Sequence, residues 1–136
     1  LDVPALERAL TRVRARHAPL RTTIAPGDPE PTQVVHPAGW WPLPRVDLSS
    51  VPAEGRRAEC LRLVRADAGT PFHLERGPLV RTLLVRESAD RHVLVVTVHH
   101  IVSDGWSTSV LLNDLAACYE AETTGRPPAL PALPLS

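Results

Sequence analysis

The sequence predicts an α/β fold, a sandwich built from short strands and amphipathic helices. Three observations predict it. Apolar residues recur at helical spacing in residues 2–16 and 111–119. The run 93–98 is β-branched and nearly continuous, which is typical of a strand covered on both faces. Two strand-like segments, 79–86 and 92–98, are separated by five polar residues and therefore predict a hairpin.

The first predicted element is a helix from Asp2 to about Arg16. Asp2 can accept hydrogen bonds from the amides of the first turn, and Pro4 lies where a helix tolerates proline. The apolar residues that share one face of this helix are Leu6, Leu10 and Val13. The chain is then expected to enter a strand from Leu20 to Ile24.

A turn at residues 27–31, rich in glycine and proline, leads to a second short strand, Thr32 to His36. A looser stretch follows and contains Trp40 and Trp41 among prolines. This aromatic pair can line a channel or a partner surface, or it can cap the core. We favour the core, because aromatic side chains in such loops bury large apolar areas.

The next helix is expected to open at Ser50 and Pro52 and to end at Gly69. Its predicted apolar stripe consists of Ala58, Leu61, Val64 and Ala68. The hairpin follows, with strands Leu79 to Arg86 and His92 to Val98. A last helix stops near Gly125, and its predicted buried face consists of Leu111, Leu115, Cys118 and Tyr119.

Composition limits the class of protein. A chain of 136 residues with 43% hydrophobic content is long enough to bury one core, and no apolar run in it is long enough to cross a membrane. The 15 basic and 15 acidic residues balance, so no nucleic-acid or anionic membrane surface is expected. Cys60 and Cys118 lack the spacing of metal or redox sites, so we expect two buried thiols, no metal and a cytoplasmic location.

The most informative motif is His99-His100-Ile101-Val102-Ser103-Asp104-Gly105. A strand delivers the two imidazoles, and the following residues change to helical spacing. Residues 103–105 are therefore expected to form a turn in which free amides and the positive end of a helix dipole meet. A proton acceptor beside an anion site suits acyl transfer.

Each residue of the motif has more than one possible role. Asp104 can cap the helix, orient an imidazole or pair with an arginine, and Gly105 permits a tight turn or close approach of a substrate. Because successive strand residues point to opposite faces, we expect only one of His99 and His100 to face a given cleft. A histidine pair and an Asp-Gly turn also occur by chance, but their fixed spacing between a strand and a helix favours function.

The motif 99–105 resembles the HHxxxDG core of the condensation domains of nonribosomal peptide synthetases. Residues 16–24, RHAPLRTTI, resemble the family's RHxxLRTxF segment, and residues 71–81, PFHLERGPLVR, are similar to its PFDLxxGPLxR segment. The departures are Ala18 where the family usually has Glu, Ile24 where it has Phe and His73 where it has Asp. None of them touches the histidine, aspartate and glycine of the core.

The resemblance implies a chloramphenicol-acetyltransferase-like two-layer sandwich, of which this chain is the N-terminal lobe only. Residues 1–136 are then a partial condensation domain, truncated at both ends, and the C-terminal lobe is missing. Because the family's active site lies between two lobes, we expect this chain to be inactive by itself.

The resemblance also implies the reaction, which is peptide bond formation between carrier-bound acyl or peptidyl and aminoacyl thioesters. It assigns the catalytic role to His100, with the Gly105 amide as donor to the oxyanion. His99, Asp104, Arg16 and Arg21 are expected to support the site, the arginines through structural pairing. No cofactor is expected to bind directly, since phosphopantetheine carries the substrates on upstream and downstream carrier proteins. An adenylation domain is the other expected partner.

Other interpretations of the same motif stay open. A related acyltransferase would transfer an acyl group from coenzyme A or a carrier to an alcohol or amine. An epimerising relative keeps the same motif core. A non-catalytic recruiting domain of the same fold would be expected to lose motif histidines, and both are present here.

Overall fold

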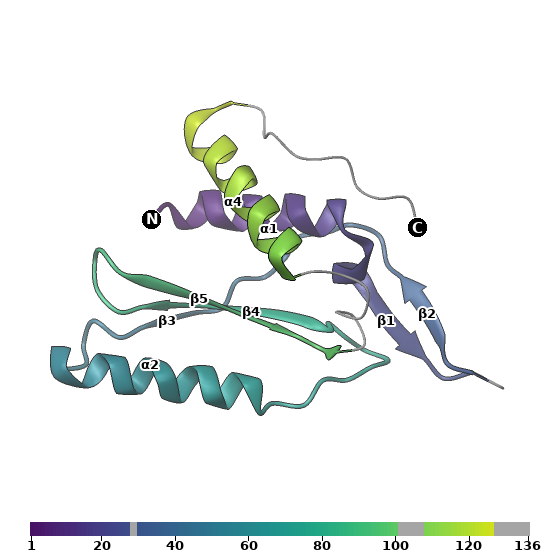
Figure 1. The fold of residues 1–136 in the computed structure, drawn as a ribbon, viewed down its shortest axis with the longest axis horizontal. Helices are drawn as coiled ribbons and strands as arrows, with labels where there is room; N and C mark the ends of the chain where they lie inside the picture. Colours follow the sequence, from purple (N-terminus) through teal and green to yellow (C-terminus); the bar gives the residue numbers. More distant parts are fainter. Residues whose placement is uncertain (28–29, 101–107, 127–136) are drawn as a thin grey trace.

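The computed structural model describes residues 1–27, 30–100 and 108–126. Within these residues a three-stranded sheet lies between helices, and a separate two-stranded sheet projects from one end (Figure 1). The elements in chain order are α1 (Val3–Arg16), the 3-10 helix η1 (Ala18–Arg21), β1 (Thr22–Ala25), β2 (Thr32–Val35), β3 (Arg45–Asp47), α2 (Ala53–Ala68), β4 (Val80–Arg86), β5 (His92–Val98) and α4 (Thr108–Thr124). This arrangement confirms the predicted α/β class.

The central sheet has the strand order β3-β4-β5. β4 and β5 pair antiparallel from Val80 opposite Val98 to Arg86 opposite His92, which confirms the predicted hairpin. β3 pairs parallel with the end of β4 and was not expected from the sequence. Three residues are too few to display an alternating pattern, so only the pairing with β4 identifies this strand.

Both faces of the sheet are covered (Figure 1). On one face Leu84, Leu94 and Val96 pack with the apolar residues of α1 and α4. On the other face Val85 and Val95 pack with α2. Even and odd positions of the two strands thus supply opposite cores, as strand geometry requires. The expectation that the run 93–98 is covered on both faces is confirmed.

Helix α1 begins as predicted, since the Asp2 carboxylate accepts a hydrogen bond from the Ala5 amide at 3.1 Å. Its end differs from the expectation. The chain forms the 3-10 helix η1, with Pro19 in its first turn, before the strand begins at Thr22 rather than at Leu20. β1 then pairs with β2 in the two-stranded sheet.

The predicted apolar stripe of α2 is wrong. Leu61 is 44% exposed, and Ala58 and Ala68 are also exposed. The face that packs on the sheet carries Cys60, Leu63 and Val64. Apolar residues occur on more than one side of this helix, so its sequence alone does not select a face, and contact with β4 and β5 does.

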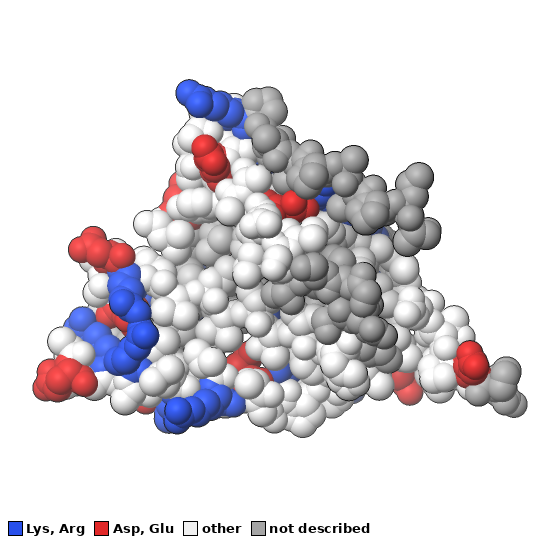
Figure 2. Space-filling model, viewed as in Figure 1, with Lys and Arg blue, Asp and Glu red and all other residues white. Residues whose placement is uncertain are grey.

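The two thiols behave as expected, because Cys60 and Cys118 are both buried and free. Burial raises the pKa of each thiol. In the described part of the chain, no helix combines the length and the apolar character needed to cross a membrane. Charged side chains of both signs are scattered around the rim of the face in Figure 2, with mostly uncharged atoms between them.

Gly77 is the glycine with the strictest requirement. Its φ is +63°, and a Cβ there would lie 2.7 Å from Cγ2 of Thr23. We expect Gly77→Ala to lower the free energy of unfolding by about 1–2 kcal/mol, because a left-handed backbone disfavours any Cβ. Urea titration measures the change. The control is Gly39→Ala, since a Cβ at Gly39 meets nothing within 4 Å. Equal effects of the two substitutions would contradict this prediction.

Candidate functional site

The histidine pair lies where β5 ends. The amide of His99 donates a hydrogen bond to the Leu79 carbonyl at 2.9 Å, so the pairing of the hairpin continues one residue beyond Val98. The strand therefore delivers the histidines, as the sequence predicts. His100 is exposed and His99 is half-buried.

The two imidazoles do not point to opposite faces, and that expectation is wrong. Their rings stack with centroids 4.4 Å apart and an interplanar angle of 27°. Alternation between faces holds only inside a strand, and β5 ends at Val98. His99 and His100 therefore form one unit.

Phe72 is the aromatic neighbour of this unit. Its ring lies 5.3 Å from the His99 ring, at 83°, in an edge contact. Burial lowers the pKa of His99, and the charge that His100 can carry lowers it further. The environment therefore favours a neutral His99.

Arg81 secures Phe72 from the other side. Its guanidinium carbon lies 4.1 Å from the centre of the Phe72 ring. The same group donates hydrogen bonds to the carbonyl oxygens of Asp67 at 2.7 Å, Thr70 at 3.0 Å and Pro71 at 3.2 Å. Sequence reasoning treated Phe72 and Arg81 only as parts of the segment 71–81, and that shared segment was the available signal.

Arg16 has the structural pairing that was expected of it. Its Nε lies 3.0 Å from Oδ2 of Asp114, and Nε2 of His17 lies 2.6 Å from the same oxygen. Asp114 is 1% exposed. Sequence reasoning missed this residue, although a carboxylate inside the apolar stripe of the last helix was a usable signal, because buried charges are paired.

Arg21 closes the carboxyl end of α1. It donates hydrogen bonds to the carbonyl oxygens of Arg14 at 3.0 Å, Ala15 at 3.1 Å and His36 at 2.8 Å. The carbonyls at a helix end lack partners within the helix, so an arginine stabilises them. Asp104 and Gly105, together with the predicted turn at 103–105, lie outside the described residues.

The tryptophan pair divides between core and surface. Trp41 is 6% exposed and belongs to the core that includes α1 and α4, whereas Trp40 is 55% exposed. Both line a groove of about 640 Å³, which also carries Arg14, Arg21 and Arg81. The preference for a core role is therefore confirmed for Trp41.

The family model of the condensation domain matches residues 1–135. The chain belongs to the condensation domain family. A linear gramicidin synthase of Brevibacillus parabrevis is 45% identical over 99% of this chain, which covers 2% of that protein. The chondramide synthase of Chondromyces crocatus is 44% identical over 99% of the chain, which covers 4% of that protein.

Solved condensation domains share the fold. The first condensation domain of the calcium-dependent antibiotic synthetase, solved with a substrate analogue, has a TM-score of 0.82 and 31% identity. The match covers 98% of this chain and 32% of that one. The starter condensation domain of rhizomide synthetase has a TM-score of 0.83 and 26% identity, covering 95% of this chain and 31% of that one. This condensation-domain chain therefore has the chloramphenicol-acetyltransferase-like fold and spans about a third of its solved relatives.

Proposed function

We propose that this chain is the N-terminal lobe of a condensation domain that joins two carrier-bound thioesters through an amide bond. The observation that carries the proposal is the stacked pair of His99 and His100 at the end of β5, with His100 exposed, in a chain of the condensation family. A second lobe, supplied by residues outside 1–136, completes the site.

In this reaction the acceptor amine attacks the donor thioester carbonyl. A carbon–nitrogen bond forms, the carbon–sulfur bond breaks, and the donor thiol leaves with the proton that the amine loses. An α-amino group has a pKa of about 7.7 to 8.0, so an appreciable fraction is already nucleophilic near neutral pH. His100 is therefore assigned to orienting the amine and accepting its proton from the tetrahedral intermediate.

The other site residues have supporting roles. The Gly105 amide donates to the oxyanion of the intermediate, and Asp104 holds the turn in shape. His99 supports His100 through the ring stack, and its neutral form avoids repulsion between two imidazolium ions. Arg16 and Arg21 fix the carboxyl end of α1.

The substrates arrive on phosphopantetheine arms of upstream and downstream peptidyl carrier proteins, and an adenylation domain supplies the amino acid. The relatives named above are synthases of peptide products, which supports this assignment. The buried free thiols Cys60 and Cys118 fit the reducing cytoplasm as the location.

The test is reconstitution. A complete condensation domain that carries these residues receives a donor-loaded and an acceptor-loaded carrier protein, and mass spectrometry measures the amide on the acceptor carrier. A parallel reaction replaces the donor carrier with the matching acyl-coenzyme A. We expect product from the two carriers, and none from residues 1–136 alone. Product only from acyl-coenzyme A, or an epimerised acceptor without a new amide, would refute the proposed function.

A further inference from the structure

Four side chains connect the end of α2 to the histidine pair. Arg81 on β4 lies directly opposite Thr97 on β5 in the strand register. Thr97 donates a hydrogen bond from its hydroxyl to the carboxylate of Asp67, near the end of α2. The same carboxylate lies 3.9 Å from Nε of Arg81. Since Thr97 comes two residues before His99, the network ties α2 to the base of the histidine pair.

Arg81 acts on the segment after α2 as well. Its three hydrogen bonds to the carbonyls of residues 67, 70 and 71 fix the backbone that immediately precedes Phe72. Its cation then covers the face of the Phe72 ring at 4.1 Å. Backbone and ring of Phe72 are therefore held by one side chain.

The held ring contacts His99, and His99 contacts His100. Phe72 meets the His99 ring at 5.3 Å and 83°, and the His99 ring stacks on His100 at 4.4 Å. A shift of Phe72 removes one wall of the space that His99 occupies. Because the imidazoles stack, a shift of His99 also changes the position of His100.

We propose that Arg81 is a positioning residue of the reaction, which acts through Phe72 and His99 on His100. This inference rests on the proposed function, in which His100 is the catalytic group. The role requires arginine rather than lysine, because only the planar fork reaches several carbonyls at once and covers an aromatic ring.

The structural test uses histidine labelled with ¹³C at Cε1 in a complete condensation domain, with the His99 signal assigned from a His99→Gln variant. An aromatic ring shifts the resonances of nuclei close to it, so Phe72→Leu is expected to move the His99 signal. Arg81→Gln is expected to move it in the same direction, although Arg81 itself does not stack on His99. Arg81→Lys, which keeps the charge and the fold more conservatively, is expected to give the same direction of change.

The control is Arg86→Gln on the same strand. Arg86 forms an exposed ion pair with Asp47 at 3.3 Å and is expected to leave the His99 signal unchanged. A folded Arg81→Gln or Arg81→Lys variant with an unchanged His99 signal would overturn the proposal. An equal change in the Arg86→Gln variant would overturn it too.

Kinetics separate positioning from simple stabilisation. Arg81→Lys is expected to lower kcat for amide formation by about 10-fold or more, with unchanged KM for both carrier substrates, since small displacements of a catalytic group are costly. An unchanged kcat in a variant whose His99 signal moves would overturn the positioning role. If the unaltered domain forms no amide, the proposed function fails, and the His99 signal still decides whether Arg81 controls the histidine pair.

Discussion

Replacing His100 with alanine in a complete condensation domain is expected to lower amide formation by at least about 100-fold, in the range that a general acid or base contributes. The imidazole is exposed at the end of β5, so the substitution removes chemistry without opening a cavity in the core. Single-turnover assays with both carriers loaded measure the rate. Binding of the carriers is expected to stay intact, which titration of unloaded carrier proteins would verify.

His73→Ala is the matched control for this prediction. His73 is an exposed histidine in the loop that follows α2, outside the proposed machinery. The variant is expected to turn over at the rate of the unaltered domain. Full activity of the His100→Ala variant would exclude the catalytic role of His100, and loss of carrier binding would reassign the residue to docking.

Asp114→Ala is expected to lower the free energy of unfolding by about 3–5 kcal/mol, the cost of breaking a buried charged pair from one side. Oδ2 of Asp114 lies 3.0 Å from Nε of Arg16 and 2.6 Å from Nε2 of His17, and the side chains of Asp114 and His17 are 2% and 3% exposed. The substitution disconnects α4 from the end of α1. Urea titration followed by the fluorescence of the buried Trp41 measures the loss.

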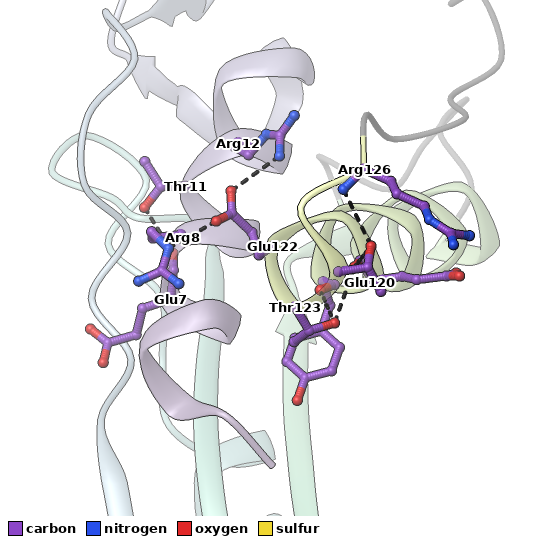
Figure 3. A network of polar contacts seen from close by, with 10 residues as sticks. Glu7, Arg8, Thr11, Arg12, Glu120, Glu122, Thr123 and Arg126 are labelled. Atoms are coloured by element: carbon purple, nitrogen blue, oxygen red, sulfur yellow. Dashed lines mark hydrogen bonds and ion pairs between the residues drawn. The ribbon is translucent and has the colours of Figure 1, made fainter.

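Glu122→Ala provides the control on the same helix. Glu122 pairs with Arg8 at 2.8 Å and with Arg12 at 3.1 Å (Figure 3), and both arginines are more than 40% exposed. Hydrogen bonds from Arg8 and Arg12 hold the pKa of Glu122 below its usual value. Ion pairs open to water contribute little, so this variant is expected to lose far less stability. A loss as large as that of Asp114→Ala would show that the helix contact, not burial of the pair, sets the effect.

Local signals predicted the parts of the fold that depend on neighbours in sequence. The Asp2 cap, the end of α1 at Arg16, and the hairpin of β4 and β5 each follow from residues a few positions apart. The motif and its two companion segments also predicted the family, because their spacing is specific.

The side chains around the histidine pair depend on contacts between distant segments. Phe72 reaches His99 across 27 positions of sequence, and Asp114 reaches His17 across 97. The orientation of His100 beside His99 depends on where β5 ends, which periodicity places only within a few residues.

For this protein, the sequence by itself determined the order of helices and strands, the condensation family and the strand that carries the histidines, since periodicity, caps and motif spacing are properties of the chain. Only the tertiary structure decided that α2 packs through Cys60 and Val64, that β3 is a strand, and that the two imidazoles stack beside Phe72. The physical reason is that burial and pairing are settled by whichever distant surface fills the space, and that surface is not encoded in any local window.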